Sequence, residues 1–160
     1  TEQLVYQPTE VANVTIVAEL KLGNGIALIA ARGRPATMAN ADTYDGYYAL
    51  IWINGSTHQL WIGRQHGKEY PPIVLDGPTP TVKYAPGTRY RLTLTVVGAS
   101  PVQLTATVER FVNNAYVISA SASAVDASAL RFDKPGLFGF GAQGNGGEAF
   151  DTFTALAAKP

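Results

Sequence analysis

The sequence predicts an all-β domain in which two antiparallel sheets form a sandwich or a barrel. About ten short runs rich in β-branched, aliphatic and aromatic residues follow one another, separated by glycine, proline and asparagine. No stretch has an amphipathic pattern long enough for a stable helix, and strands do not alternate with helical segments as they do around parallel sheets. At 160 residues, the whole chain (residues 1–160) is expected to form a single domain.

The first strands are expected at residues 14–22 and 26–32. Their sequences, VTIVAELKL and IALIAAR, are separated by the triplet GNG at residues 23–25. Because glycine and asparagine tolerate the positive φ angles of tight turns, this triplet predicts a β-hairpin. A second hairpin is expected from residues 47–53 (YYALIWI) and 59–64 (QLWIGR), which the segment NGSTH joins.

Residues 89–97 have the clearest strand pattern, because polar and apolar residues alternate along RYRLTLTVV with a period of two. Residues 102–110, VQLTATVER, alternate in the same way after a short connector. We expect these two segments to pair as an antiparallel ribbon with one buried face. Further strands are expected at residues 115–124, 136–142 and 150–157.

The composition argues against several classes of protein. Lys and Arg number 12 and Asp and Glu number 12, so the net charge is zero and no nucleic-acid partner is expected. No apolar run approaches the length of a membrane-spanning helix, so no membrane insertion is expected. The lack of cysteine excludes disulfides, thiolate metal sites and cysteine nucleophiles. The chain begins without a recognisable signal peptide, as expected of a mature chain or of a domain from a longer parent chain.

Aromatic residues are concentrated between residues 44 and 70, where they could form a binding platform. The apolar faces of sugar rings stack on aromatic side chains, while polar neighbours hold the hydroxyl groups. Strand alternation places Tyr48 and Trp52 on one face and Tyr47 on the other, so only one set can face a ligand. Core packing is the alternative for Trp52 and Trp61. The candidate carbohydrate-binding residues are Arg34, Asp42, Tyr44, Tyr47, Trp52, Trp61, Arg64 and His66.

Two further features contribute polar groups to this region. The loop at residues 33–46 is long for a connection between strands, and long loops are often functional. Its Asp42 and Asp45 could ligate calcium, with turn capping as the alternative. Arg64 and His66 could donate to hydroxyls or to a carboxylate, with a solvated strand end as the alternative.

The order of several segments is shared with a known family. These segments are IALIAAR, DGYYALIWI and LWIGRQHG between residues 25 and 67, PGTRYRLTLTVVG from residue 86, PGLFG from residue 135 and FDTF from residue 150. In this order the chain resembles the concanavalin A-like lectin/glucanase superfamily, specifically its laminin-G-like bacterial modules. The resemblance implies a two-sheet antiparallel jelly-roll sandwich and an extracellular or cell-surface accessory domain that associates with a glycan or polysaccharide.

The same resemblance implies a structural calcium site. In many laminin-G-like modules the Asp of a final F-D-x-F strand contributes to such a site, and Asp151 has this place in FDTF. The acidic residue that usually accompanies it is not evident near the N-terminus, and Glu10 and Glu148 are the candidate substitutes. The alternative to a calcium site is that backbone amides donate hydrogen bonds to the carboxylate of Asp151.

No catalytic residue is expected from the strand motifs. Glycoside hydrolysis normally needs two carboxylates about 5 to 10 Å apart, and the E-x-D-x-x-E strand of laminarinase-like enzymes does not occur. The R-x-E-L-R strand of jelly-roll alginate lyases does not occur either. We therefore expect a non-catalytic carbohydrate-binding, lectin-like module of an extracellular protein. The alternatives are a structural or assembly domain, for adhesion or for cell-surface or virion decoration, that contacts other protein subunits, and a glycan hydrolase or lyase.

Overall fold

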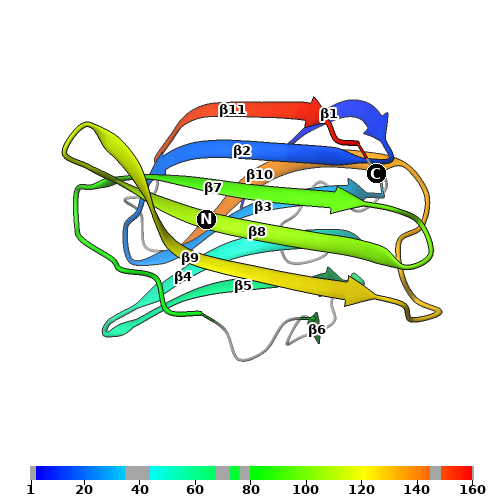
Figure 1. Cartoon of the computed structure of the whole chain (residues 1–160), viewed down its shortest axis with the longest axis horizontal. Coiled ribbons are helices and arrows are strands. Elements are labelled where there is room, and N and C mark those ends of the chain that lie inside the picture. The colour runs from blue at the N-terminus through cyan, green and yellow to red at the C-terminus, as the bar shows by residue number, and fades with distance from the viewer. Residues whose placement is uncertain (1–2, 35–43, 68–72, 76–79, 145–148, 160) are drawn as a thin grey trace.

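The computed structural model describes residues 3–34, 44–67, 73–75, 80–144 and 149–159, and these residues form strands and turns but no helix. The strands assemble into two antiparallel sheets that pack face to face as a sandwich (Figure 1). The all-β class and the two-sheet antiparallel architecture expected from the sequence are therefore confirmed. None of the described segments is a helix able to cross a bilayer.

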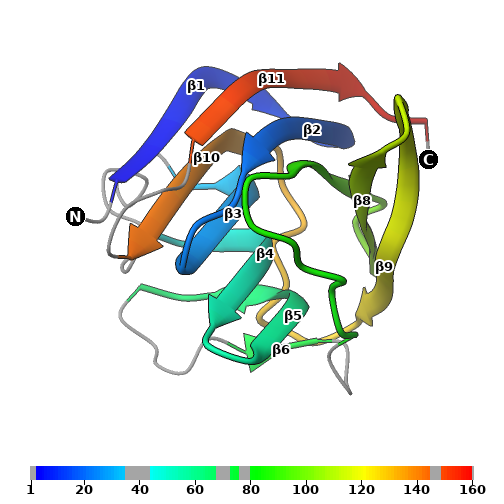
Figure 2. The same ribbon diagram turned by 90° about the vertical axis from the view of Figure 1, so that its left-hand side faces the viewer.

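The two sheets share the strands almost equally. One sheet has the order β1-β10-β3-β4-β5-β6 and the other has the order β11-β2-β7-β8-β9. Figure 2 shows them as two layers, with the edge strands β1 and β11 beside each other at one side. The strands are β1 (Gln3–Val11), β2 (Val14–Lys21), β3 (Gly25–Gly33), β4 (Gly46–Asn54), β5 (Thr57–Gln65), β6 (Ile73–Val74), β7 (Arg89–Val97), β8 (Val102–Val112), β9 (Ala115–Asp126), β10 (Gly136–Gly144) and β11 (Ala149–Ala157).

Most of the strands expected from the sequence form. β4 pairs with β5 through a tight turn in which Gly55 has a φ of 58°, as the second predicted hairpin requires. β7 pairs with β8, and Gly98, with a φ of 80°, follows β7. A Cβ atom on Gly98 would lie 2.8 Å from the carbonyl oxygen of Pro101, so both the backbone angle and the space require glycine there. The strands expected nearer the C-terminus correspond to β9, β10 and β11.

The hairpin predicted from residues 14–22 and 26–32 is wrong. Both segments are strands, but β2 belongs to the five-stranded sheet and β3 to the six-stranded sheet, so the chain crosses the sandwich between them. None of residues 23–25 adopts the positive φ of a tight hairpin turn. Leu22 is instead buried in the core and directs the connection inward. The turn residues predicted that the chain reverses its direction after β2. They did not specify whether the next strand joins the same sheet or the other one.

The sequence analysis identified no strand before residue 14, yet β1 pairs with β10 at the edge of the six-stranded sheet. Pro8 interrupts its apolar alternation, and its register with β10 shifts between Gln7 and Val11. Gly139 of β10 permits the close approach, because a Cβ atom there would lie 2.3 Å from the carbonyl oxygen of Val5. The strand therefore depends on glycine in its neighbour more than on its own pattern.

The main core lies between the sheets and takes alternate residues from the strands of the five-stranded sheet. In β2, β7 and β8 every second side chain is buried, while the others lie on the outer face. β3 and β4 differ, because consecutive side chains are buried along most of their length. The six-stranded sheet is thus covered on both faces and the five-stranded sheet on one.

Candidate functional site

The outer face of the six-stranded sheet, which points away from the sandwich core, carries a second apolar cluster. Strand alternation separates Tyr47 and Ile51, in the main core, from Tyr48 and Leu50, in the second cluster, as the sequence analysis expected. Neighbouring strands place Leu28 opposite Leu50 and Leu50 opposite Trp61, so the apolar surface crosses β3, β4 and β5. We call the residues of this surface the aromatic face: Ile26, Leu28, Leu50, Trp52 and Trp61.

Trp52 and Trp61 form the partly exposed end of the aromatic face. Their rings meet edge to face with centroids 5.4 Å apart, a favourable arrangement for two aromatic side chains. The indole nitrogen of Trp61 donates to the side-chain oxygen of Gln59 at 3.1 Å. Because its polar atom is satisfied by the protein, this indole can offer apolar surface to a partner. Ile26, opposite Trp52, is also only partly buried and extends that surface.

The aromatic face is electrically neutral. On the outer face of β3, β4 and β5, none of the described side chains carries a formal charge. Tyr44 and Tyr48 are fully buried beside it. Burial raises the pKa of both hydroxyls, and for Tyr44 the neighbouring Tyr48 raises it further, so both stay neutral at physiological pH. The face therefore favours uncharged, apolar ligands over phosphates or polyanions.

Two of the predicted carbohydrate-binding residues, Tyr47 and Arg64, lie on the opposite face of the sheet. Their strands pair Tyr47 directly with Arg64, and both side chains point into the sandwich. Arg64 forms a buried ion pair with Asp126 at 2.7 Å, and the hydroxyl of Tyr47 donates to the same carboxylate at 3.0 Å. These groups join the two sheets instead of facing a ligand.

Asp126 remains ionised in this buried setting. Burial alone would raise its pKa, but hydrogen bonds from Ser128 and Arg64, together with the Tyr47 hydroxyl, outweigh burial and lower the pKa below its ordinary value. The sequence analysis missed this residue as a functional group. The signal was available, because Ala120, Ala122 and Ala124 face inward in β9 and the same period of two puts Asp126 inward.

The other predicted binding residues are divided among different surroundings. Tyr44 is buried against the second cluster. Arg34 lies over the ring of Phe132 at 5.7 Å, and His66 packs on the same ring at 4.5 Å while its Nε2 lies 3.0 Å from the carbonyl oxygen of Leu130. Asp42 lies outside the described residues. Among the described members of the predicted set, the structure thus brings together Arg34 and His66 on Phe132, and Trp52 and Trp61 as an aromatic pair on the outer face of the six-stranded sheet.

The residues proposed for calcium are also spread over different strands. Asp151 on β11 is exposed and lies 3.5 Å from Arg89, and Glu10 is exposed on β1. Glu148 lies outside the described residues. No group of three acidic or histidine side chains able to hold a metal occurs within the described parts of the chain. The calcium site stays a prediction.

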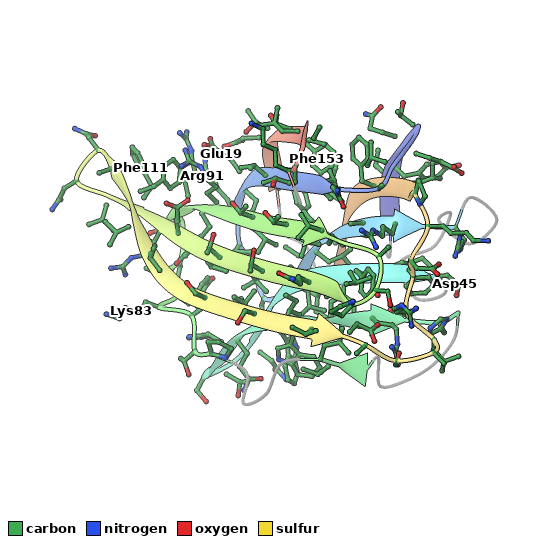
Figure 3. The ribbon with its side chains drawn as sticks, turned by 45° about the vertical axis from the view of Figure 1, so that its right-hand side comes forward. Glu19, Asp45, Lys83, Arg91, Phe111 and Phe153 are labelled. Carbon is green, nitrogen blue, oxygen red and sulfur yellow. The ribbon has the colours of Figure 1, made fainter. Side chains whose placement is uncertain are left out.

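The outer face of the five-stranded sheet is mostly polar by contrast, although Val125 of β9 is exposed on it. Arg91 lies between Glu19, at 2.9 Å, and Glu109, at 3.5 Å, and its guanidinium sits 3.6 Å from the ring centre of Tyr116. Figure 3 shows Glu19, Arg91 and Phe111 together toward one end of this sheet. The hydrogen bond from Arg91 is the largest influence on Glu19 and lowers its pKa. These charges are paired with each other across neighbouring strands.

Comparison with known proteins yields solved structures only, because no family model and no curated protein matches the chain. One similar structure is scytalido-glutamic peptidase with a peptide-based transition-state analog, at a TM-score of 0.49 and 13% identity. Another is scytalido-glutamic peptidase with a transition-state analog inhibitor, at a TM-score of 0.48 and 13% identity. The alignments cover 89% and 87% of this chain, but only 63% and 66% of the peptidase chains.

The placement of the predicted binding residues corrects the functional expectation drawn from the sequence. The non-catalytic carbohydrate-binding module expected from the sequence is not upheld, and the solved structures found are those of peptidases. The geometry gives the physical reason, since Tyr47 and Arg64 lie inside the sandwich while Trp52 and Trp61 lie on its outside. Among the described residues, the predicted sugar-binding side chains therefore do not form one surface. The relation to the concanavalin A-like superfamily stays a prediction from the resemblance.

Proposed function

We propose that this chain is a polypeptide-binding module whose aromatic face holds an apolar segment of a protein partner. The observation that carries the proposal is the Trp52–Trp61 pair, which is partly exposed above a continuous apolar surface. Tryptophan is among the residues that contribute most to protein interfaces when packed centrally in a well-fitted patch. Apolar and aromatic side chains of a partner would contact the indoles and Ile26.

The charge of the aromatic face supports a polypeptide over other macromolecules. Its neutrality offers nothing to the phosphates of nucleic acids or the headgroups of anionic lipids. A polypeptide combines apolar side chains with an uncharged backbone, and the amide side chain of Gln59 beside Trp61 can exchange hydrogen bonds with that backbone. An interface centre with few charged residues and with aromatic side chains such as tryptophan is typical of protein–protein contacts.

The proposal is tested by selecting linear peptides from a random display library on the immobilised chain and titrating the selected peptides by tryptophan fluorescence. Trp61→Ala is expected to weaken binding about 30-fold, the effect of losing an interface residue that contributes about 2 kcal/mol. Phe111→Ala is the matched control, because Phe111 pairs with Tyr116 at 5.1 Å on the other sheet. Mass spectrometry of the same mixtures reports whether bound peptides are cleaved.

Two outcomes would reject this function. One is that no peptide is enriched above the background of an unrelated protein. The other is that selected peptides bind Trp61→Ala as tightly as the parent chain while the variant keeps its native circular dichroism spectrum. Loss of binding in Phe111→Ala alone would move the site to the five-stranded sheet.

We also infer a jelly-roll connection of the strands, as the family resemblance implies. In support, the chain passes repeatedly from one sheet to the other, for example between β2 and β3 and between β9 and β10. Structural calcium and an extracellular or cell-surface location stay predictions from the same resemblance. A calcium-dependent rise of the thermal unfolding midpoint that is absent in Asp151→Asn would support the metal site.

A further inference from the structure

The core of the sandwich is open along one side. The edge strand β1 of one sheet approaches the edge strand β11 of the other (Figure 2). A cavity of about 370 Å³ is lined by residues of β1, β11 and their neighbours. Core residues Val11, Val14, Phe138, Phe153 and Ala155 line it. We call this place the seam. Its volume far exceeds the roughly 30 Å³ that one water molecule occupies in the liquid, so it is larger than a packing defect.

The seam is where the main core is least completely covered. Most of the hydrophobic residues that pack against the main core but are only partly buried lie on the strands around the seam: Val11, Phe138, Phe140, Phe150, Phe153 and Ala155. Three large hydrophobic side chains on β1 and β11 are exposed as well, namely Val5 (52%), Tyr6 (40%) and Leu156 (59%). Closing the seam would remove apolar surface from water and would therefore be favourable.

The two strands beside the seam do not pair with each other among the described residues. β1 pairs with β10 and β11 pairs with β2, which leaves one backbone edge of each strand without a strand neighbour. β11 is regular against β2 from Thr152 to Ala157. β1 is irregular between Gln7 and Val11 and contains Pro8, which has no N–H to donate. Of the two edges, β11 is therefore the one able to template a further strand.

We propose that the seam accepts an extended segment of another polypeptide, which pairs with β11 as an added strand. An added strand supplies backbone N–H and C=O groups to the β11 edge, which an alkyl chain cannot do. Alternate apolar side chains of the segment enter the cavity over Phe138 and Phe153. All residues lining the seam are uncharged, so the inserted side chains are uncharged too. This site is separate from the aromatic face, which lies on the other side of the six-stranded sheet.

The experiment selects linear peptides from a random display library on the variant Trp52→Ala/Trp61→Ala, in which the aromatic face is removed and the seam is intact. Enriched peptides are expected to alternate apolar and polar residues without proline in the paired stretch. Ala155→Leu fills the cavity and is expected to weaken their binding at least about tenfold. Ala127→Leu, the same change at an exposed residue after β9, is the control and is expected to leave binding unchanged.

Hydrogen–deuterium exchange on the parent chain provides a readout that needs no substitution. A bound peptide is expected to slow exchange of the amides between Thr152 and Ala157, while those of β9, at the far edge of the same sheet, stay unchanged. Protection of β9 instead, selected peptides without alternation, or unchanged affinity in a natively folded Ala155→Leu would overturn the proposal.

Two further outcomes would overturn the proposal of an added polypeptide strand, because each identifies a different occupant of the seam. Failure to enrich any peptide, with uptake of dodecanoate that Ala155→Leu abolishes, would make the seam an alkyl-chain site. A concentration-dependent dimer in sedimentation equilibrium that Ala155→Leu dissociates would make a second copy of the chain the occupant. Failure of Trp61-dependent binding leaves the seam intact, so the two proposals fail separately.

Discussion

The outer faces of the two sheets differ in what covers them and in how the sequence encodes them. Buried and outer side chains alternate in β2, β7 and the first half of β8, so Thr15, Thr95 and Thr105 lie in a row on the outer face of the five-stranded sheet. The hydroxyl oxygens of Thr15 and Thr95 are hydrogen-bonded at 2.9 Å. The six-stranded sheet has near-continuous apolar strands, and Leu28 and Leu50 on its outer face are 5% and 8% exposed. A β-strand that is apolar on both sides therefore indicates a second covered surface. Only its end at Ile26, Trp52 and Trp61 stays partly exposed, and this is where a partner is expected.

The largest effect is expected where the two sheets are joined, because Arg64 belongs to one sheet and Asp126 to the other. Asp126→Ala leaves the buried guanidinium of Arg64 without its carboxylate partner. The Nε atom of Arg64 already has no hydrogen-bond partner. We expect a loss of about 3 to 5 kcal/mol in the free energy of unfolding. Urea denaturation measures it, and a loss below about 1 kcal/mol would show that the pair does not hold the sheets together.

The comparison of the two outer faces is tested by matched truncations. Leu28→Ala on the six-stranded sheet is expected to cost about 2 to 4 kcal/mol, since the side chain is buried. Thr105→Ala on the five-stranded sheet removes an exposed side chain and is expected to change stability by less than about 0.5 kcal/mol. Equal losses in urea denaturation would mean that the two faces are covered alike.

The dependence of stability on pH in acid measures the contribution of the Asp126 charge to the fold. Because its pKa is lowered in the folded chain, its ionisation stabilises the fold above the unfolded-state pKa, about 4, and this contribution is lost as the pH falls through the folded-state value. Thermal unfolding of the parent chain should therefore show a steeper decline below about pH 4 than unfolding of Asp126→Asn. Parallel declines would assign the acid sensitivity to other carboxylates.

A small effect is also expected for the ion pair on the polar outer face. Glu19→Gln removes the ion pair with Arg91, whose side chain is 32% exposed and also contacts Glu109. Surface pairs of this kind contribute about 0 to 1 kcal/mol. We expect a decrease within that range in urea and a smaller one at high salt. A loss comparable to that of Leu28→Ala would mean that the charges of this face stabilise the fold as strongly as the buried apolar side chains on the outer face of the six-stranded sheet.

Local pattern was sufficient to predict most strands, but not how distant strands meet. The alternation in β7 and β8 specifies which side chains are buried, since a period of two leaves one choice of face. The triplet at residues 23–25 specified a turn and not a sheet, and the place of β1 depends on Gly139, far away in sequence. These features are set by packing between remote segments, which a local pattern does not contain.

The candidate site was predicted only in part, because a local pattern shows which face of a strand a residue is on but not which distant residue it meets. Alternation separated Tyr48 and Trp52 from Tyr47, as the structure confirms. The position of Arg64 required the register of the β4–β5 hairpin, in which Asn54 opposite Thr57 places Tyr47 opposite Arg64. Without that register Arg64 was predicted to bind a carbohydrate, with a solvated strand end as the alternative, and Asp126 was not predicted to be its partner.

The central claim is that partners bind the aromatic face of the six-stranded sheet and not the polar face of the five-stranded sheet. Hydrogen–deuterium exchange with a peptide selected on the parent chain and dependent on Trp61 tests it most directly. We predict slower exchange in β3, β4 and β5 around Trp52 and Trp61, with β7 and β8 unchanged. Protection confined to β7 and β8 would contradict the claim and place binding on the polar face.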